Sequence, residues 1–386
     1  MKTFLDIHQQ SLNHQGEQLC GDQAKVVRGK DNITIVLSDG LGSGVKANIL
    51  ATLTTEILAT MLREGMNLKD VLETVVSTLP TCQVRKIAYA TFTILQLRPE
   101  DNHFTVINFD NPPPLFLKQG VLTPLDVSYE EILGKEVAIS DGYLELGDFI
   151  GLISDGVLYA GLGQAMNFGW GWENIGHYIE EIFAQRVFSA RTVVNGVISK
   201  TRMLYQNEIG DDATFVGVFA RNRHALMVFT GPPQDECHDF IYVDKLLDFE
   251  GRKAVCGGTT GNIVASFLNT SIETDISTLR ENIPPIGRLP GIDLVTEGII
   301  TIALTLDHLR NCRGDISKVE PDNNGAYLLT RELLMADEVN FLVGNQVNPV
   351  HHNPALPNNV SVRRYLVEQI ADELRKLNKD VSIEFC

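Results

Sequence analysis

Residues 33–44 read Ile-Thr-Ile-Val-Leu-Ser-Asp-Gly-Leu-Gly-Ser-Gly, and this stretch decides the fold of the first half of the chain. Ile33–Leu37 is a short apolar run rich in β-branched residues, which is typical of a buried strand. Asp39 follows among three glycines, and Lys46 begins a helical pattern that continues to Glu64. A carboxylate at the end of a strand, beside bare backbone, is well placed to bind a divalent cation through oxygen. Taken alone, however, an Asp-Gly step is more typical of a structural turn.

A second copy of this pattern makes a functional site the better interpretation. Residues 149–156 read Phe-Ile-Gly-Leu-Ile-Ser-Asp-Gly, so Asp155 again follows an apolar strand. Two more acidic positions lie at strand edges: Asp22 in a Gly-Asp pair, and the neighbours Asp211 and Asp212 ahead of a further apolar run. Each acid alone could be a turn or cap residue, and Asp211 and Asp212 are ambiguous by one position.

Acids from distant positions can meet at one end of a sheet, and together these acids predict a metal site. Hard cations such as Mg²⁺ and Mn²⁺ prefer oxygen ligands and keep several waters, so few carboxylates are needed. Two such ions that share a carboxylate can activate a water against a phosphoryl group. The pattern therefore predicts phosphoryl chemistry at a two-ion site in the first half of the chain.

The composition describes an ordinary globular protein with an acidic charge balance. Of the 386 residues, 44% are hydrophobic and 21% are charged, which suits two or three domains with real cores. The formal net charge is −17, whereas nucleic acids and anionic membranes bind basic surfaces. We therefore expect neither nucleic acid nor a membrane among the partners.

Cysteine usage and the N-terminus predict a cytoplasmic protein. The cysteines are scattered without Cys-x-x-Cys spacing, which indicates reduced thiols and neither a disulfide framework nor a zinc site; they are Cys20, Cys82, Cys237, Cys256, Cys312 and Cys386. The first residues lack the apolar core of a signal peptide. By inspection, no stretch approaches the roughly 20 apolar residues of a membrane helix.

The order of predicted elements divides the chain in two. The first half is expected to hold helices over 46–64, 68–79, 172–186 and 189–205, and strands in hairpin succession, among them a pair over 144–153 that turns at Gly147-Asp148. A glycine-rich loop or flap is expected over 157–176. Blocks of strands and blocks of helices indicate an α+β domain. Because the composition changes at 221–224, we place the domains at 1–222 and 223–386.

The second half alternates strands and helices, which predicts an α/β domain. Its most distinctive segment is the glycine-rich turn Cys256–Asn262, which follows a strand and precedes a helix. Free amides in such a turn could bind a small anion, although a plain strand–helix turn is the commoner case and no nucleotide-binding fingerprint is present. The pairs Cys237-His238 and His351-His352 have poor spacing for a soft metal.

The first half resembles a known family through three motifs in order. These are Leu37-Ser-Asp-Gly-Leu-Gly-Ser-Gly44, Leu152-Ile-Ser-Asp-Gly-Val157 and Asp211-Asp-Ala-Thr-Phe215. They are similar to the motifs of metal-dependent (PPM-type) serine/threonine protein phosphatases, in the bacterial sporulation stage II protein E branch. The resemblance covers roughly residues 15–220.

The resemblance implies a fold, a site and a reaction. The fold would be a β-sandwich of two antiparallel sheets flanked by helices, with two Mn²⁺ or Mg²⁺ ions at one end. Asp39 would bridge the ions with the carbonyl of Gly40 beside it, Asp155 and Asp211 or Asp212 would hold the second ion, and Asp22 would bind directly or through water. Asp39, Asp155 and Asp211 would thus carry the catalysis. Metal-bound hydroxide would attack a phosphoserine or phosphothreonine in a single step.

Two departures from the family accompany this resemblance. Eukaryotic members hold the substrate phosphate with an arginine near the first acidic motif, and the segment between Gly16 and Asp22 offers none, as is general in the bacterial branch. Ala213 stands where members often have methionine, a change in packing and not in ligation. The helices after Lys46 correspond to a regulatory switch in this branch, so activity is expected to depend on a partner or on homodimerisation.

The leading hypothesis is thus a phosphatase acting on a phosphorylated regulatory protein, with a C-terminal sensor, interaction or dimerisation module. The alternative is a catalytically weak scaffold, or a ligand sensor whose second domain binds a small anion or metabolite at Cys256–Asn262. Retention of all the acids favours the enzyme.

Overall fold

A computed structural model of the chain describes residues 3–78, 90–132, 134–185, 189–281, 283–345 and 362–386. The chain separates into two compact units, 1–222 and 223–386. The division between Asn222 and Arg223 falls at the change of composition seen in the sequence. Each unit is described below by itself.

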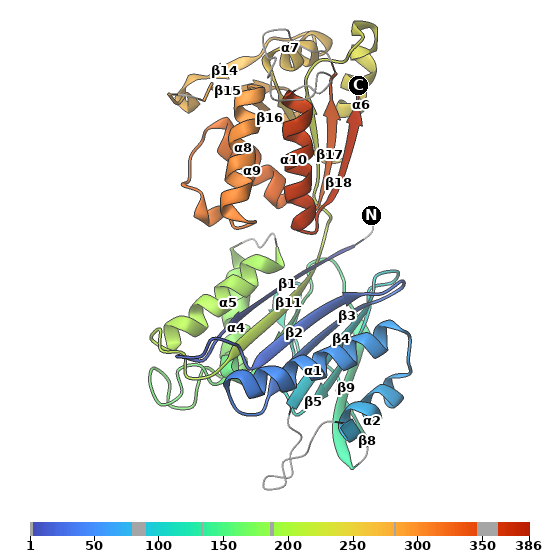
Figure 1. The fold of residues 1–386 in the computed structure, drawn as a ribbon, viewed down its shortest axis with the longest axis vertical. Coiled ribbons are helices and arrows are strands. Elements are labelled where there is room, and N and C mark those ends of the chain that lie inside the picture. Colours follow the sequence, from blue (N-terminus) through green and yellow to red (C-terminus); the bar gives the residue numbers. More distant parts are fainter. Residues whose placement is uncertain (1–2, 79–89, 133, 186–188, 282, 346–361) are drawn as a thin grey trace. The chain divides into compact units, whose positions relative to one another are not determined.

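The first unit contains two antiparallel sheets (Figure 1). One has the strand order β2-β3-β4-β5-β9-β8, and the other β1-β11-β10-β6-β7. Their strands are β1 (Phe4–Leu12), β2 (Asp22–Arg28), β3 (Ile33–Gly40), β4 (Ala90–Arg98), β5 (His103–Phe109), β6 (Leu115–Lys118), β7 (Val121–Leu122), β8 (Ser128–Ile132), β9 (Lys135–Tyr143), β10 (Phe149–Ile153) and β11 (Ala213–Arg221).

Helices cover the outer faces of both sheets. They are α1 (Gly44–Arg63), α2 (Leu68–Thr78), the short α3 (Asp155–Leu158), α4 (Trp172–Ala184) and α5 (Ala190–Leu204). Side chains of α1 and α2 pack on the β2–β9 sheet, and those of α4 and α5 pack on the β1–β11 sheet. A further core lies between the sheets, where residues of β3, β4 and β5 meet those of β10 and β11. This arrangement confirms the predicted α+β sandwich.

Alternation along β3 explains why its middle residues are all apolar. Ile35 and Leu37 point into the core between the sheets, whereas Val36 packs under α1 and α2. A strand buried on both faces is therefore rich in apolar side chains. Two helices of this unit begin at side-chain caps, since Asn67 Oδ1 accepts a hydrogen bond from Lys69 N at 2.9 Å and Ser189 Oγ accepts one from Thr192 N at 3.4 Å.

One sequence prediction in this unit is wrong. The segment 144–153 is not a strand pair: β9 ends at Tyr143 and pairs with β5, whereas β10 lies in the other sheet. The turn expected between them is present, and the buried Asp148 carboxylate holds it by accepting hydrogen bonds from Glu145 N and Gln119 N. Gln119 lies 29 residues away in the sequence, so the local pattern did not reveal that contact.

The loop expected over 157–176 is present at residues 159–171, and helices take up its two ends. α3 takes up Val157 and Leu158, and α4 begins at Trp172. Trp170 is buried in the core beneath α4 and α5. The indole of Trp172 donates a hydrogen bond to the carbonyl oxygen of Pro113 at 3.0 Å. The two tryptophans hold this segment against the unit.

Helix α1 is more apolar than we expected, because the sequence analysis found no stretch that approaches the length of a membrane helix. Within the described ranges it is the one helix whose length and composition meet the criteria for a membrane span, and 39% of its most apolar window is buried. Its inner residues pack on the sheet, whereas Val45, Ile49 and Leu53 are exposed. A helix that packs in a protein core meets the same criteria by length and composition alone.

The second unit is a doubly wound α/β domain built on one mixed sheet (Figure 1). Its strand order is β14-β15-β16-β13-β12-β17-β18, in which β16, β13, β12, β17 and β18 are parallel and β15 pairs antiparallel with both β14 and β16. The strands are β12 (Ala225–Thr230), β13 (Arg252–Cys256), β14 (Glu273–Asp275), β15 (Ile286–Leu289), β16 (Ile292–Thr296), β17 (Glu338–Val343) and β18 (Asp380–Phe385).

Helices cover both faces of this sheet, as the apolar character of its parallel strands requires. They are α6 (Asp239–Leu247), α7 (Gly258–Phe267), α8 (Ile299–Cys312), α9 (Gly325–Met335) and α10 (Val362–Lys376), with short 3₁₀ turns η1 (Glu236–His238), η2 (Ile276–Thr278) and η3 (Ile316–Lys318). α6 and α7 pack on one face, and α8, α9 and α10 on the other. The predicted α/β class is confirmed, although β14, β15 and β16 were missed.

Prediction on the core of the first unit. Phe92 is fully buried and stacks on Phe109 with ring centroids 5.0 Å apart. Phe92→Ala should lower the free energy of unfolding by about 3–5 kcal/mol, because it removes buried apolar surface and leaves a cavity. Urea unfolding measures this change. Phe168→Ala is the control, since Phe168 is 87% exposed; equal losses in the two variants would contradict the packing described here.

Candidate metal centre

The acids of the first unit are brought together by strand pairing. Asp22 begins β2 and lies directly opposite Asp39, near the end of β3. In the other sheet, Asp155 follows β10, and Asp211 and Asp212 precede β11, its hydrogen-bonded neighbour. The carboxylates of the two sheets interact electrostatically, since Asp22, Asp155 and Asp211 all raise the pKa of Asp39. The structure thus gathers all five predicted acids at one end of the sandwich.

Main-chain and hydroxyl contacts fix these strand ends. Ser154 N donates to the carbonyl oxygen of Thr214 at 3.0 Å, and Thr214 N donates to Ser154 Oγ at 2.8 Å. The hydroxyl of Ser38 donates to the carbonyl oxygen of Thr91 at 2.9 Å. The serine of each Ser-Asp-Gly motif therefore ties its strand to a neighbour, and the aspartate that follows is held at the edge.

Asp22 and Asp212 are the most deeply buried of the acids. Asp22 is 2% exposed, and neither of its carboxylate oxygens has a hydrogen-bond partner among the described residues. Asp212 is 3% exposed; its Oδ1 accepts a hydrogen bond from His14 N at 2.9 Å, whereas its Oδ2 has no partner in the described parts. Buried carboxylate oxygens without donors are costly unless they are protonated or bind a cation.

Burial and mutual repulsion raise the pKa values of these groups. The pKa of Asp39 rises to about 9, mainly through burial and then through neighbouring carboxylates. Burial raises the pKa of Asp22 to about 8, with Ser154 and Thr214 opposing the rise and neighbouring carboxylates adding to it. Burial and Asp155 raise the pKa of Asp211 to about 6, and His14 offsets part of this rise. Burial also raises the pKa of Asp155. A bound cation would reverse these shifts.

The donor set fits hard divalent cations. Every candidate side chain offers carboxylate oxygen, and the orphaned oxygens of Asp22 and Asp212 point to an absent positive charge. Among the described residues, no three of these acids bring one oxygen each within 4.8 Å of one another. The cluster is therefore wider than an all-protein cage, which suits ions that keep several waters.

Glycines allow the close approach of main chains beside the acids. A side chain at Gly40 would overlap the main-chain oxygen of Ala47 in α1, and one at Gly156 would overlap that of Asp212. The glycines of both Ser-Asp-Gly motifs are thus required by packing. The prediction that the Gly40 carbonyl faces an ion stays a prediction, as does the choice between Asp211, which is exposed, and Asp212, which is buried.

Two residues near the site had no signal in the sequence. His14 lies in the connection between β1 and β2 and reaches Asp212 through its main-chain N–H, while its Nδ1 is enclosed without a partner in the described residues. The carboxylate of Glu17 lies beside Gly44 at the N-terminus of α1, where the helix dipole favours a negative charge. Neither residue belongs to a recognisable motif, and only the tertiary fold brings them to the site.

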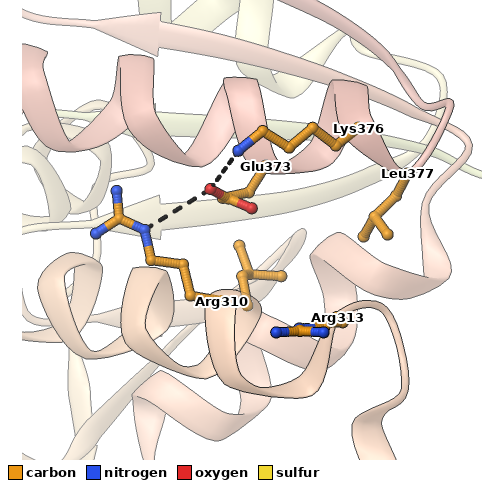
Figure 2. Close-up of a pocket in the computed structure, with 6 residues that line it drawn as sticks. Arg310, Arg313, Glu373, Lys376 and Leu377 are labelled. Carbon is orange, nitrogen blue, oxygen red and sulfur yellow. Dashed lines mark hydrogen bonds and ion pairs between the residues drawn. The ribbon is translucent and has the colours of Figure 1, made fainter.

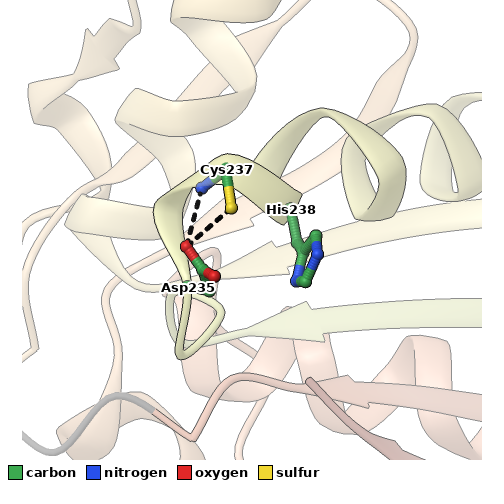
Figure 3. Close-up of side chains that lie close together, drawn as sticks. All are labelled: Asp235, Cys237 and His238. Carbon is green, nitrogen blue, oxygen red and sulfur yellow. Dashed lines mark hydrogen bonds between the residues drawn. The ribbon is translucent and has the colours of Figure 1, made fainter.

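The histidine- and cysteine-containing segments noted in the sequence are weaker candidates for a metal site. Asp235, Cys237 and His238 lie close together, but all three are exposed, and Cys237 Sγ donates to Asp235 Oδ1 at 2.8 Å (Figure 3). They belong to one local turn in which Asp235 caps η1. His351-His352 lies outside the described residues, so that pair stays untested.

The predicted free turn Cys256–Asn262 is only partly a turn. α7 begins at Gly258, so Gly258–Asn262 are helical, and Gly257 N donates to the carbonyl oxygen of Thr296 at 2.9 Å. The Glu297 carboxylate lies 3.3 Å from where a side chain of Gly258 would begin. A negative charge already stands beside this helix N-terminus, which weakens the case for a small anion there.

Comparison with known proteins identifies the first unit. Residues 29–220 match the profile of the family described as Stage II sporulation protein E (SpoIIE). No curated protein matches the sequence. Among solved structures, the PP2C phosphatase domain with a fragment of the regulatory domain of SpoIIE from Bacillus subtilis is similar at a TM-score of 0.50 and 17% identity. That match covers 57% of this chain and 62% of the other, so it indicates a shared fold.

Other similar structures have lower TM-scores. The RsbU and RsbW domains of a Mycobacterium tuberculosis protein match at a TM-score of 0.48 and 19% identity, over 63% of this chain and 67% of that one. RsbX in complex with magnesium matches at 0.40 and 19% identity, over 56% of this chain and 95% of that one.

Prediction on main-chain packing at the site. Gly156→Ala should weaken Mn²⁺ binding by at least ~10-fold, because the added methyl group must push the main chain of Asp212 away. Isothermal titration calorimetry with Mn²⁺ measures the affinity. The matched control is Gly298→Ala in the second unit, whose methyl group would make only ordinary contact with Gly257. Unchanged Mn²⁺ affinity in a folded Gly156→Ala variant would contradict the proposed site.

Prediction on pH. In metal-free protein the folded state keeps protons on Asp22 and Asp39, with pKa values near 8 and 9, that the unfolded state releases near 3.8. Folding therefore binds protons, and the contribution of these groups to stability falls as pH rises from about 5 to about 8. In EDTA, Asp39→Asn should gain stability relative to wild type across this range. Thermal melts measure the difference, with Asp110→Asn, an exposed acid, as control; a constant difference would contradict the shifts.

Proposed function

Since residues 29–220 of this chain form a domain of the SpoIIE family, a branch of the PPM-type phosphatases, we propose that the first unit hydrolyses phosphoserine or phosphothreonine on a regulatory protein. The observation that carries the proposal is the set of five acids from two sheets, which meet at one end of the sandwich. Enclosed carboxylate oxygens without partners call for cations at this place.

The acids of this site would together bind two Mn²⁺ or Mg²⁺ ions. Asp39 is central because its carboxylate interacts with acids of both sheets. Asp155 and Asp211 or Asp212 approach from β10 and β11, and Asp22 approaches from β2. Bound divalent ions supply a water of lowered pKa and polarise a phosphoryl oxygen. The protein's own part is to fix the acids at rigid strand ends and to exclude cationic side chains that would compete for them.

The alternative of a non-catalytic scaffold is less well supported. A phosphoprotein-binding scaffold has no use for buried carboxylates that raise one another's pKa values, because this repulsion destabilises the fold. Strained groups of this kind are retained where they serve a function. The clustering therefore favours the enzyme, with phosphate ester hydrolysis as its reaction.

We further propose that the second unit is a sensor, interaction or dimerisation module for the phosphatase. Its doubly wound sheet belongs to an architecture that commonly binds ligands. The acidic net charge of −17 favours protein partners over nucleic acids or membranes. The cytoplasmic location expected from the sequence stays a prediction.

Prediction on activity. The full chain with Mn²⁺ should hydrolyse p-nitrophenyl phosphate, and Asp39→Asn and Asp155→Asn should each reduce kcat by at least ~100-fold, because an amide cannot replace a carboxylate ligand on a hard cation. Release of nitrophenolate measures the rate. Asp110→Asn makes the same chemical change at an exposed acid and should leave kcat unchanged.

Measuring Mn²⁺ binding together with hydrolysis distinguishes an enzyme from a non-catalytic scaffold. If wild type binds Mn²⁺ but hydrolyses neither p-nitrophenyl phosphate nor a phosphoserine peptide with any divalent ion, the scaffold is correct and the enzyme proposal fails. If Asp39→Asn retains full activity, the assignment of the site is wrong.

A further inference from the structure

The second unit has a topological switch point in its sheet. β12 lies in the middle, β13 and β16 follow on one side, and the chain then crosses to place β17 and β18 on the other side. The connections after β12 and β17 therefore leave the same edge in opposite directions. In doubly wound sheets, ligands bind outside the carboxyl ends of the strands at this point.

The two connections meet through glycines at the switch point. Gly231 follows β12 with a φ of +81°, and Gly344 follows β17 and donates its N–H to the carbonyl oxygen of Thr230 at 2.9 Å. A side chain at Gly344 would overlap the main chain of Gly231 and Pro232. Glycine is therefore required at this edge so that the two connections can pack closely against each other.

Arg363 stands over this backbone. It lies in the first turn of α10, and its side chain packs on Gly231, where an added side chain would overlap Nη1 and approach Cδ to 3.0 Å. The residue is half-buried, and its Nε is enclosed without a hydrogen-bond partner among the described residues. Burial lowers the pKa of the guanidinium, and no carboxylate of the described residues offsets this effect.

Other enclosed arginines of the chain have acidic partners. Arg221 is 8% exposed, and its Nε lies 2.9 Å from Asp6 Oδ2. Arg364, half-buried like Arg363, has its Nε 2.9 Å from Glu368 Oε1. An enclosed guanidinium without a partner is unfavourable by itself. In an acidic protein that pairs its other enclosed arginines, the exception at Arg363 indicates that the partner is a ligand.

Two other features of this unit are weaker candidates. The N-terminus of α7 already faces the Glu297 carboxylate, as described above. A cavity of about 390 Å³ lies between the C-terminal ends of α8 and α10 (Figure 2), but its charges are satisfied internally: Lys376 Nζ lies 2.9 Å from Glu373 Oε1, and Arg310 Nε lies 3.7 Å from the same oxygen. Arg313 also lines this cavity and is exposed, which makes it a useful control.

We propose that the second unit binds a small oxyanion-bearing ligand at the switch between β12 and β17, with Arg363 as the residue that contacts the anion. A guanidinium offers paired N–H donors in a plane, which match two oxygens of a phosphate or carboxylate. This site differs from the turn Cys256–Asn262 and does not depend on the proposed phosphatase activity.

Calorimetry and thermal shift on the full chain test the proposal, with ATP, AMP, inorganic phosphate and citrate as probes. Wild type should bind at least one probe, and Arg363→Gln should weaken that binding by at least ~10-fold. Arg313→Gln, which removes an exposed arginine at the opposite edge, should bind as wild type does. Binding of AMP or ATP beyond phosphate would identify a nucleotide, and binding of citrate alone a carboxylate.

Stability distinguishes a ligand-binding role from a structural one. Without a probe, Arg363→Met should have a melting temperature equal to or above that of wild type, because it removes an uncompensated enclosed charge while keeping similar volume. A clear fall would assign Arg363 to the fold and overturn the proposal. Equal probe affinity in wild type and Arg363→Gln would also overturn it, as would failure of wild type to bind every probe.

Discussion

The mutual repulsion of carboxylates in the first unit is the constraint on which its architecture depends. Asp22 and Asp39 face each other across a strand pair, and Asp155 approaches from the second sheet closely enough to raise the pKa of Asp39. Only rigid elements can hold such groups together. The fold supplies this rigidity through strands buried on both faces, serine hydroxyls that tie the strand ends, and glycines that admit neighbouring main chain. The stability of the sandwich and the affinity for cations are therefore two consequences of one arrangement.

Much of the first unit could be predicted because its signals are local. An apolar strand that ends in Ser-Asp-Gly specifies both burial and an acid at the edge, and its recurrence at Asp155 predicted that the two sites meet. The path between β9 and β10 could not be predicted, because each strand pairs with strands from distant parts of the chain and the two lie in different sheets. His14 and Glu17 were missed for a similar reason. A residue that acts through its main-chain N–H, or through the end of a helix, leaves no pattern in the sequence.

In the second unit the sequence predicted elements better than their arrangement. Apolar runs mark β12 and the 341–343 end of β17, because strands buried on both faces are rich in apolar residues. β14 is a short edge strand and β15 is the short strand beside it, and most of their residues are exposed or half-exposed, so they lack that signal. The strand order depends on which way the chain crosses the sheet, which no local pattern encodes. The switch point, and with it the position of Arg363, could emerge only from the structure.

Each unit holds enclosed charge without a partner among the described residues, negative in the first unit and positive in the second. In the first, acids from several strands share one edge, and their oxygens have no donors; in the second, a guanidinium stands over bare backbone, and it has no acceptor among the described residues. Folding alone favours neither arrangement, because each buries charge without compensation. Elsewhere the chain pairs enclosed charges carefully, as Arg221 does with Asp6. The sign of each uncompensated charge therefore specifies its ligand: cations for the acidic edge of the sandwich, and an oxyanion for the switch point of the α/β sheet.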